Sequence, residues 1–388
     1  MASGDKPYRV YRGGRAKGKV PTIPRPTGDG GRDGRRSGRV LPEPPGGRRM
    51  RRRTTVLLVL LVLFVAFVAW AITGFLSVRS GVEAANARLP ADARAALAPQ
   101  DGLVLNQPTT IALFGTDHAQ EIAERASARR SDSIMLVRTD ARRNRLAYLS
   151  VPRDLRVDIP GIGAGRINSA FQIGGPGLAL RTLRNFTGVP INHVVVVDFA
   201  DFTELIDAMG GITVDNPKPI LSNRFDCPYP TQERCQEWQG WRFRQGELEL
   251  DGYRALVYSR VRENRLDPGE TDVTRGERQQ RVLQAITGEV ASASTLLRLP
   301  TLGDDLARPL ATDLSTWQFL QLGWRNLRAD DSRTLRCRLG GEPSSYGGES
   351  ILVPSEENRN VIAMFLGVSA PQPPAPGIPL APGCLVGR

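Results

Sequence analysis

The longest apolar run in the chain extends from Thr54 to Val78, and its 25 residues carry no charge. As an α-helix this run would be roughly 37 Å long, which exceeds the ~30 Å hydrocarbon core of a bilayer. The run is also too long for the apolar part of a signal peptide. We therefore expect one transmembrane helix over residues 54–78. The arginines at 51–53 predict a cytoplasmic N-terminus and an extracytoplasmic domain, because basic residues gather on the cytoplasmic side.

Beyond residue 108, strand-like and helix-like patterns alternate along the chain. A strand over Thr110–Phe114 is expected to end at Gly115, and His193–Asp198 has the continuous apolar pattern of a buried strand. Apolar segments at 133–139 and 145–151 flank a polar turn at 140–144, which is typical of a hairpin. Helical patterns occupy residues 178–186, 201–209, 252–261, 272–293 and 315–328. This alternation predicts an α/β domain with layered α-β-α architecture and a central mixed sheet.

The composition of the remaining segments predicts how the chain is organised around the membrane helix and the α/β domain. Residues 1–53 are rich in Gly, Pro and Arg and have few apolar residues, so we expect a disordered basic tail. The Ala-rich segment 79–107 is expected to form a short helix and a juxtamembrane stalk. The main domain is expected at 108–294, and 295–370 is expected to be a C-terminal helical part that closes it. Residues 371–388 are expected to be an irregular Pro-rich tail.

The net charge of +12 belongs entirely to the N-terminal tail. Residues 1–53 hold 16 Lys/Arg and 4 Asp/Glu, and subtracting these from the totals of 52 and 40 leaves 36 of each sign. The main domain is therefore neutral. Together with the apolar helix that separates it from the tail, this neutrality argues against nucleic acid as a partner.

Four cysteines lie in the second half of the chain, and their spacing fits no zinc site. Cys227 and Cys235 fall in a segment of little periodicity, 217–245, and we expect them to form a disulfide in an oxidising compartment. A second bond between Cys337 and Cys384 would tie down the C-terminal tail, and the sequence leaves this pairing open.

Charged residues gather at the open end of the predicted hairpin. If its strands pair antiparallel, Arg130 and Asp132 lie near Arg153 and Asp154. Two structural ion pairs are the simplest interpretation. Asp117, just beyond the first predicted strand, adds a third carboxylate, and carboxylates are suitable ligands for a hard cation.

The helix predicted from residue 272 places Arg275, Arg278 and Gln279 on the same face as its apolar residues. The opposite face, with Gln280 and Arg281, is expected to meet solvent. Cations in the first turns oppose the helix dipole, and a bound anion would remove the conflict. Pairing with nearby acids is the alternative.

Arg260 and Arg262 lie close by in sequence. Arginines that bind phosphates, together with acids that bind a cation, suit a metal-bound pyrophosphate.

An ordered series of short motifs then carries a family resemblance. The chain resembles the LytR-CpsA-Psr family of cell-wall glycopolymer ligases over residues 108–294. The motifs are GTD (115–117), RSDSIML (130–136), VPRD (151–154), RINSAF (166–171), HVVVVDF (193–199), DAMGGI (207–212), LDGYRAL (250–256), YSRVR (258–262) and RGERQQ (275–280). A cytoplasmic tail, one membrane helix and an external domain are also similar to the organisation of that family.

The resemblance implies Mg²⁺-dependent transfer of a glycopolymer from a polyprenyl-pyrophosphate carrier to peptidoglycan, with formation of a phosphodiester. It implies that Asp117 and Asp132 bind the metal and that Asp154 orients Arg153 or activates the acceptor hydroxyl. Arg153, Asp154 and Asp132 would then be the catalytic residues. The pyrophosphate would be bound by Arg130, Arg153, Arg166, Arg260, Arg262, Arg275, Arg278 and Gln279. His118 and Arg166 depart from common family residues, and Arg166 preserves the charge of the usual Lys.

Two other functions are compatible with the sequence. One is a polyprenyl-pyrophosphate phosphatase, and the other is a non-catalytic envelope regulator or scaffold. The sequence identifies neither the polymer nor the acceptor position.

Overall fold

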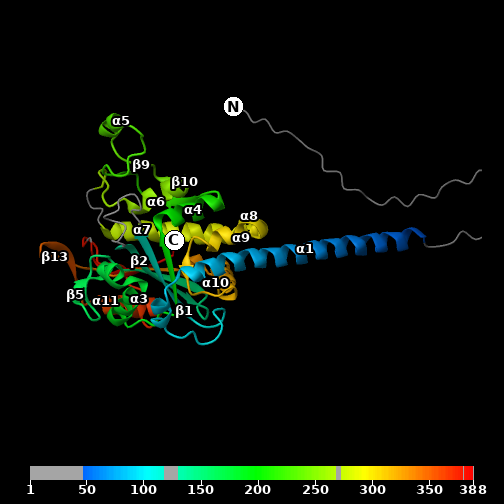
Figure 1. Ribbon diagram of the computed structural model, residues 1–388, viewed down its shortest axis with the longest axis horizontal. Helices are drawn as coiled ribbons and strands as arrows, with labels where there is room; N and C mark the ends of the chain where they lie inside the picture. Colours follow the sequence, from blue (N-terminus) through cyan, green and yellow to red (C-terminus); the bar gives the residue numbers. More distant parts are fainter. Residues whose placement is uncertain (1–46, 118–129, 268–271, 379, 388) are drawn as a thin grey trace, which may run out of the picture. The chain divides into compact units, whose positions relative to one another are not determined.

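A seven-stranded mixed sheet forms the centre of the computed structural model, which describes residues 47–117, 130–267, 272–378 and 380–387 (Figure 1). The strand order is β11-β6-β1-β2-β3-β12-β15. The strands are β1 (Thr109–Asp117), β2 (Arg130–Asp140), β3 (Arg145–Ser150), β6 (His193–Asp198), β11 (Ala311–Thr312), β12 (Leu335–Arg338) and β15 (Gly383–Val386). The pairs β1/β6 and β3/β12 are parallel and the other pairs are antiparallel, which confirms the predicted mixed sheet.

Helices cover both faces of this sheet (Figure 1). One face packs against α2 (Ala91–Ala95), α3 (Ile167–Thr187) and α11 (Asn358–Leu366). The other side carries α4 (Phe199–Met209), α6 (Gly252–Arg260), α7 (Asp272–Val290), α9 (Leu299–Ala307) and α10 (Thr316–Arg328). Strand alternation assigns Phe114, Leu136 and Leu149 to the α3 core, and it places Met135 and Tyr148 on the α7 side.

Smaller elements complete the fold. The remaining helices are α5 (Gln232–Glu237), α8 (Ala293–Leu297) and the 3₁₀ turn η1 (Asp331–Arg333). Four strand pairs lie outside the main sheet: β4 (Arg156–Ile159) with β5 (Gly163–Arg166), β7 (Ile212–Asn216) with β10 (Gly246–Leu250), β8 (Ile220–Leu221) with β9 (Arg242–Phe243), and β13 (Gly341–Tyr346) with β14 (Glu349–Pro354).

The apolar run lies in one long helix, α1 (Gly47–Arg88). Its part from Arg52 to Arg88 is the one segment of the described residues that is long and apolar enough to cross a membrane. The large apolar side chains from Val56 to Phe67 are all more than half exposed. Because such a surface is stable only in an apolar environment, α1 fits the single predicted membrane helix.

The predicted stalk at 79–107 is wrong, because this segment belongs to the fold. Val82 and Ala85 on α1 and Ala93 on α2 are almost fully buried against the domain. The small side chains that suggested a stalk instead allow close helix packing.

Three further boundaries differ from the sequence prediction. Strand β1 continues through Asp117, because its end pairs with β2. Helix α3 begins at Ile167, directly after the glycine-rich segment 161–166, and bends at Gly174 and Gly175. The C-terminal tail is not irregular throughout, since β15 pairs with β12 and Cys384 is bonded to Cys337. This disulfide settles the pairing that the sequence left open.

Candidate active site

A cavity of about 640 Å³ lies between the sheet and the helices α4, α7 and α10. The interior is mainly apolar. It is lined among others by Leu113, Met135, Val137 and Tyr148 from the sheet, Phe202 and Leu205 from α4, Val282, Leu283 and Ile286 from α7, and Phe319 and Leu322 from α10. Burial raises the pKa of Tyr148 to about 12, so this side chain stays uncharged at physiological pH.

Polar side chains gather in one part of the same cavity lining. Four residues predicted to bind pyrophosphate are among them: Arg260, Arg262, Arg275 and Gln279. They come from the end of α6, the segment after it, and the first turns of α7. The fold therefore joins cationic and amide groups from separate motifs to an apolar chamber.

The first turns of α7 are anchored to the hairpin by side-chain hydrogen bonds. Ser133 of β2 donates its hydroxyl to Gln279 Oε1 at 2.9 Å, and Gln279 Nε2 donates to the Ser259 carbonyl at 3.5 Å. Arg275, beside them, is only 6% exposed. A guanidinium held this deeply in a cavity wall is well placed to bind an anion with little competition from water.

The expected solvent-facing position of Gln280 is wrong. Gln280 is 2% exposed and donates from Nε2 to Ser150 Oγ at 2.8 Å and to the Cys337 carbonyl at 3.0 Å. Gly276 makes this approach possible, because a Cβ there would lie 3.3 Å from Ser150 Oγ. Helix α7 thus covers the end of β3, and its side away from the cavity is also packed.

Arg278 has a different environment from Arg275. It is 2% exposed, does not line the cavity, and donates to the carbonyl of Val261. Val261 lies between Arg260 and Arg262, so this bond fixes the segment that presents those two arginines. Arg278 is therefore a positioning residue for Arg260 and Arg262.

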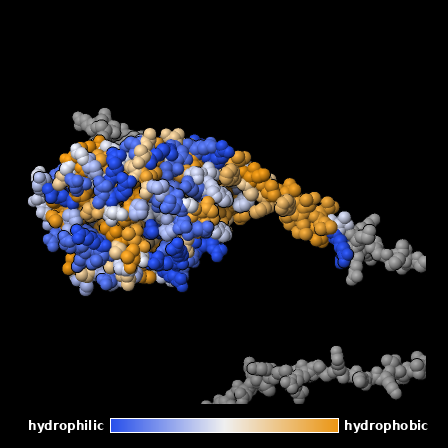
Figure 2. Space-filling model, turned by 90° about the horizontal axis from the view of Figure 1, so that it is seen from below, coloured by the Kyte–Doolittle hydropathy of each residue, from blue (hydrophilic) through white to orange (hydrophobic). Residues whose placement is uncertain are grey.

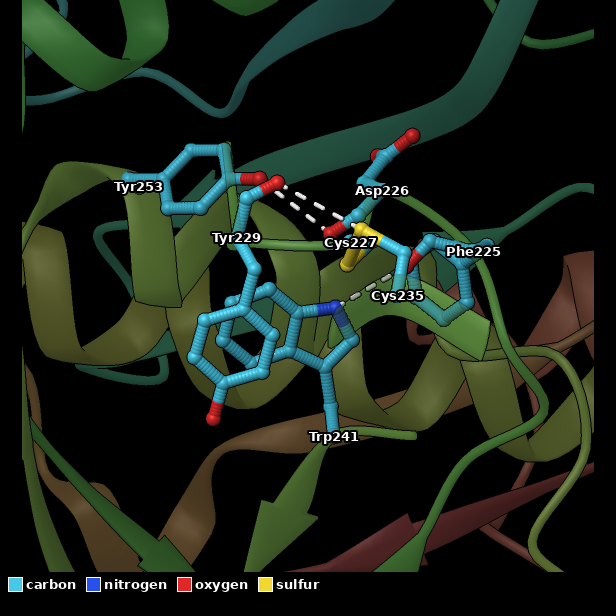
Figure 3. The surroundings of a disulfide bond; sticks show 7 residues. All are labelled: Phe225, Asp226, Cys227, Tyr229, Cys235, Trp241 and Tyr253. Atoms are coloured by element: carbon cyan, nitrogen blue, oxygen red, sulfur yellow. Dashed lines mark hydrogen bonds between the residues drawn. A yellow bond between two sulfur atoms is a disulfide. The ribbon is translucent and has the colours of Figure 1, made fainter. Parts of the chain in front are cut away.

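Arg260 is held by an insertion that carries a disulfide. Figure 3 shows the surroundings of this disulfide. The Arg260 guanidinium pairs with Asp226 and lies 4.8 Å from the centre of the Phe199 ring. Cys227, next to Asp226, is bonded to Cys235 as expected. The Tyr253 hydroxyl and the Trp241 ring nitrogen donate to the carbonyls of Asp226 and Phe225 at 3.4 and 3.0 Å. These contacts fix the insertion beside the polar part of the cavity.

The VPRD motif, directly after β3, forms a second charged group. Asp154 lies between two arginines, with Arg153 Nε 3.4 Å from Oδ2 and Arg166 Nη1 3.8 Å from Oδ1. Arg166 also pairs with Glu349 at 2.9 Å. Asp154 is therefore positioned to orient both guanidiniums, although none of these three side chains lines the 640 Å³ cavity.

The side chains of Asp117, Arg130 and Asp132 lie outside the described part of the structure, but their backbone positions are described. Asp117 pairs with Arg130 across β1 and β2. Asp132 has no partner in the register, because Gly115 pairs with Ser133 and Thr116 with Ser131. It is therefore the extra residue of a β-bulge, a feature that often redirects a side chain beside an active site.

Asp198 is a site residue that the sequence analysis did not select. It ends β6, lies opposite Thr116 of β1, caps α4 by accepting from the Asp201 amide at 2.8 Å, and lines the cavity. Its position after a buried parallel strand was the signal, because ligands bind at the carboxyl ends of such strands. Burial and the Asp198 charge together raise the pKa of Asp201 to about 6, despite the opposing effect of Arg88.

Within the described residues, no three acidic, histidine or cysteine side chains gather as a metal site. This statement does not cover the predicted ligands Asp117 and Asp132, whose side chains lie outside the described part of the structure.

The chain is similar to proteins of known family. The family model described as "LytR_cpsA_psr family" matches residues 76–363. A polyisoprenyl-teichoic acid–peptidoglycan teichoic acid transferase, TagU of Halalkalibacterium halodurans, is 27% identical over 257 residues, which are 66% of this chain and 77% of the relative. TagV of Bacillus subtilis is 30% identical over 219 residues, which are 56% of this chain and 52% of the relative. The chain thus spans between half and about three quarters of these curated relatives.

Solved structures share the fold. The crystal structure of B. subtilis TagV has a TM-score of 0.53 at 25% identity, and the match covers 68% of this chain and 99% of TagV. A structure described as TagT bound to LIIa-WTA has a TM-score of 0.53 at 23% identity and covers 69% of this chain and 94% of TagT. With the family match extending over most of the chain, this protein is a member of the LytR-CpsA-Psr family.

Proposed function

We propose that this protein is a membrane-anchored phosphotransferase that moves a glycopolymer from a polyprenyl-pyrophosphate carrier to peptidoglycan. The curated relatives are named as transferases between polyisoprenyl-linked teichoic acid and peptidoglycan. The observation that carries the proposal is one cavity with an apolar interior and three arginines in its polar part, of which Arg275 is buried, Arg260 is half-buried and Arg262 is exposed. A polyprenyl pyrophosphate has the same two-part chemistry.

In the proposed reaction, an acceptor hydroxyl oxygen attacks the phosphorus that carries the glycopolymer. The bond from that phosphorus to the bridging oxygen breaks, a phosphodiester forms, and polyprenyl phosphate leaves with the bonding electrons. Phosphoryl transfer requires mainly positioning and charge neutralisation. Arg275, Arg260 and Arg262 would bind the phosphate oxygens, and Gln279 would fix α7 against β2. The acceptor proton would pass to the Asp154 carboxylate, which would also orient Arg153 toward the phosphate oxygens.

Asp117 and Asp132 are proposed to hold Mg²⁺. The donor set is suitable, because carboxylates are preferred Mg²⁺ ligands, and the bulge at Asp132 lies at the same sheet edge as Asp117 and Asp198. When bound, the ion would supply further neutralisation of phosphate charge. We also propose that the N-terminus is cytoplasmic and the domain extracytoplasmic, in line with the arginines before the apolar run.

Replacing Arg275 tests the site. Arg275→Ala should lower the rate of glycopolymer transfer by about 10²–10³-fold, the usual effect of removing one group that stabilises transition-state charge. The assay uses the full chain in vesicles with a polyprenyl-pyrophosphate glycan and a peptidoglycan acceptor. Arg281→Ala is the matched control, because Arg281 lies on the same helix and pairs with Glu277, outside the cavity.

Transfer at the wild-type rate in Arg275→Ala would remove this assignment. With the wild-type protein, release of glycan phosphate without acceptor-linked product would favour the phosphatase, and an absence of any product would favour the scaffold. Chelation of divalent ions should stop transfer if the Mg²⁺ proposal is correct.

A further inference from the structure

Exposed apolar side chains border the long helix α1 where it meets the domain. Leu297, at the end of α8, is 73% exposed, and the adjacent Leu296 is 38% exposed. Both lie beside α1, because Trp70 donates its ring N–H to the Leu297 carbonyl at 3.1 Å. Figure 1 shows α8 next to α1, and Figure 2 shows the apolar surface of α1 reaching the body of the protein. An apolar surface that continues from a membrane helix requires an explanation in water.

The contacts beyond Trp70 fix α1 against α9. A Cβ at Gly303 would lie 2.7 Å from the Val78 side chain, so the two helices pack without space for one methyl group. The Asp304 amide also donates to Ser77 Oγ at 3.0 Å. The position of α8 along α1 is therefore determined by packing.

The length of the apolar run sets the depth of α8. A membrane helix needs about 20 residues to cross the hydrocarbon core, so counting from Arg53 the core would extend to roughly residue 73. Trp70 precedes that limit, and tryptophan is typical of the boundary between hydrocarbon and headgroups. Leu297, which contacts Trp70, would therefore lie at the depth of this boundary. Arg298 follows as an exposed cation suited to lipid phosphates.

Helix α10 approaches the depth of Trp70 and Leu297 from the C-terminal end of α1. It begins beside Asn86, which donates to the Leu314 carbonyl at 2.9 Å, and its Leu320 packs against Val78 and Val82. The helix therefore runs back along α1 toward the apolar half.

The residues at 317, 320, 324 and 327 share one face of α10. Trp324 and Leu327, nearer the C-terminal end, are 51% and 48% exposed, while Phe319 and Leu322 on another face line the cavity.

We propose that α8 and the C-terminal half of α10 form a membrane-contacting surface, with Leu296, Leu297, Trp324 and Leu327 inserted at the boundary of the bilayer from which α1 emerges. The occupant is the lipid surface, because the patch continues from the apolar part of α1 and carries Trp with adjacent Arg. Arg328 lies 5.6 Å from the centre of the Trp324 ring. The domain would thus rest on the membrane with fixed orientation, which a single flexible tether would not give.

Site-directed labelling of the full chain tests this surface. A single environment-sensitive fluorophore is attached at Leu297→Cys or Trp324→Cys in vesicles of phosphatidylethanolamine and phosphatidylglycerol. All native cysteines are in disulfides, so labelling requires no reduction. Trp317→Cys is the matched control: Trp317 shares the face of α10, is 59% exposed, and lies at the end near Asn86. Val368→Cys, 79% exposed on the segment after α11, is a second control.

We expect lipid-borne nitroxide quenchers to quench the labels at 297 and 324 several-fold more than those at 317 and 368, and aqueous iodide to show the reverse order. Equal quenching at all four positions would overturn the proposal. Protection at 297 and 324 from both quenchers would also overturn it, because it would indicate a second protein on the patch. Neither result depends on turnover, so the transferase proposal is tested separately.

Discussion

At the scale of residues, the fold withdraws charged side chains from solvent in and beside the candidate site. Arg275 is almost fully buried in the cavity wall, and Asp201 lies beside the carboxylate of Asp198. Sequence motifs identified Arg260, Arg262, Arg275 and Gln279, which line one cavity. The motifs did not distinguish Arg275 from Arg278, whose side chain bonds to a backbone carbonyl and does not line the cavity. The two arginines lie about 60° apart around α7, and only packing decides which of them faces the cavity.

The raised pKa of Asp201 predicts a pH-dependent stability. The folded state binds the proton more tightly than the unfolded state, whose Asp pKa is about 3.9. Stability from this group is therefore fully present below pH 4 and is lost as the pH rises through about 6. Compared with Asp201→Asn, the wild type should lose free energy of unfolding between pH 4 and pH 7. Denaturant titrations at several pH values measure this difference, and a constant difference would contradict the prediction.

At the scale of elements, close backbone approach fixes how helices meet. Gly252 begins α6, where its amide donates to Asp207 Oδ1 at 2.7 Å and a Cβ would collide with the Thr203 carbonyl of α4. The sequence predicted α6 and α4 well, because each has a clear helical pattern, and in the structure each follows an Asp cap. It could not predict their contact, since the pattern of one helix says nothing about the backbone of another.

Gly252→Ala should lower the free energy of unfolding by about 1–3 kcal/mol, the usual cost of forcing extra volume into a packed interface. Gly288→Ala is the control, because Gly288 is exposed on α7 and a Cβ there meets no atom within 4 Å. This second substitution should raise stability by about 0.5–1 kcal/mol through helix propensity. Thermal or denaturant unfolding measures both, and equal effects would contradict the packing argument.

At the scale of the whole molecule, the two disulfides stabilise different parts. Cys227–Cys235 closes a short loop next to Asp226, which holds Arg260. Cys337–Cys384 joins β12 to the edge strand β15 across 47 residues. The first bond therefore supports the site, and the second supports the sheet.

Replacing each pair by serine should separate these roles. Cys227→Ser with Cys235→Ser should raise KM for the lipid-linked substrate several-fold, because Arg260 loses a fixed partner, with a smaller change in melting temperature. Cys337→Ser with Cys384→Ser should lower stability by about 2–4 kcal/mol, since the longer loop gains more freedom on unfolding. Steady-state kinetics and calorimetry distinguish the two pairs, and a reversed pattern would refute the assignment.

The sequence by itself determined the elements whose evidence is local. The apolar run over 54–78, the hairpin at 133–151, the strand at 193–198 and the helix from residue 272 all follow from periodicity and turn residues within one segment. Contacts between distant segments were decided only by the tertiary structure. Packing of 79–107 into the domain, burial of Gln280 against Ser150, the bulge at Asp132 and the cavity between sheet and helices each require two surfaces to meet. The sequence pattern of one segment records its own apolar and polar positions, but it does not contain the shape of the surface that the segment will meet.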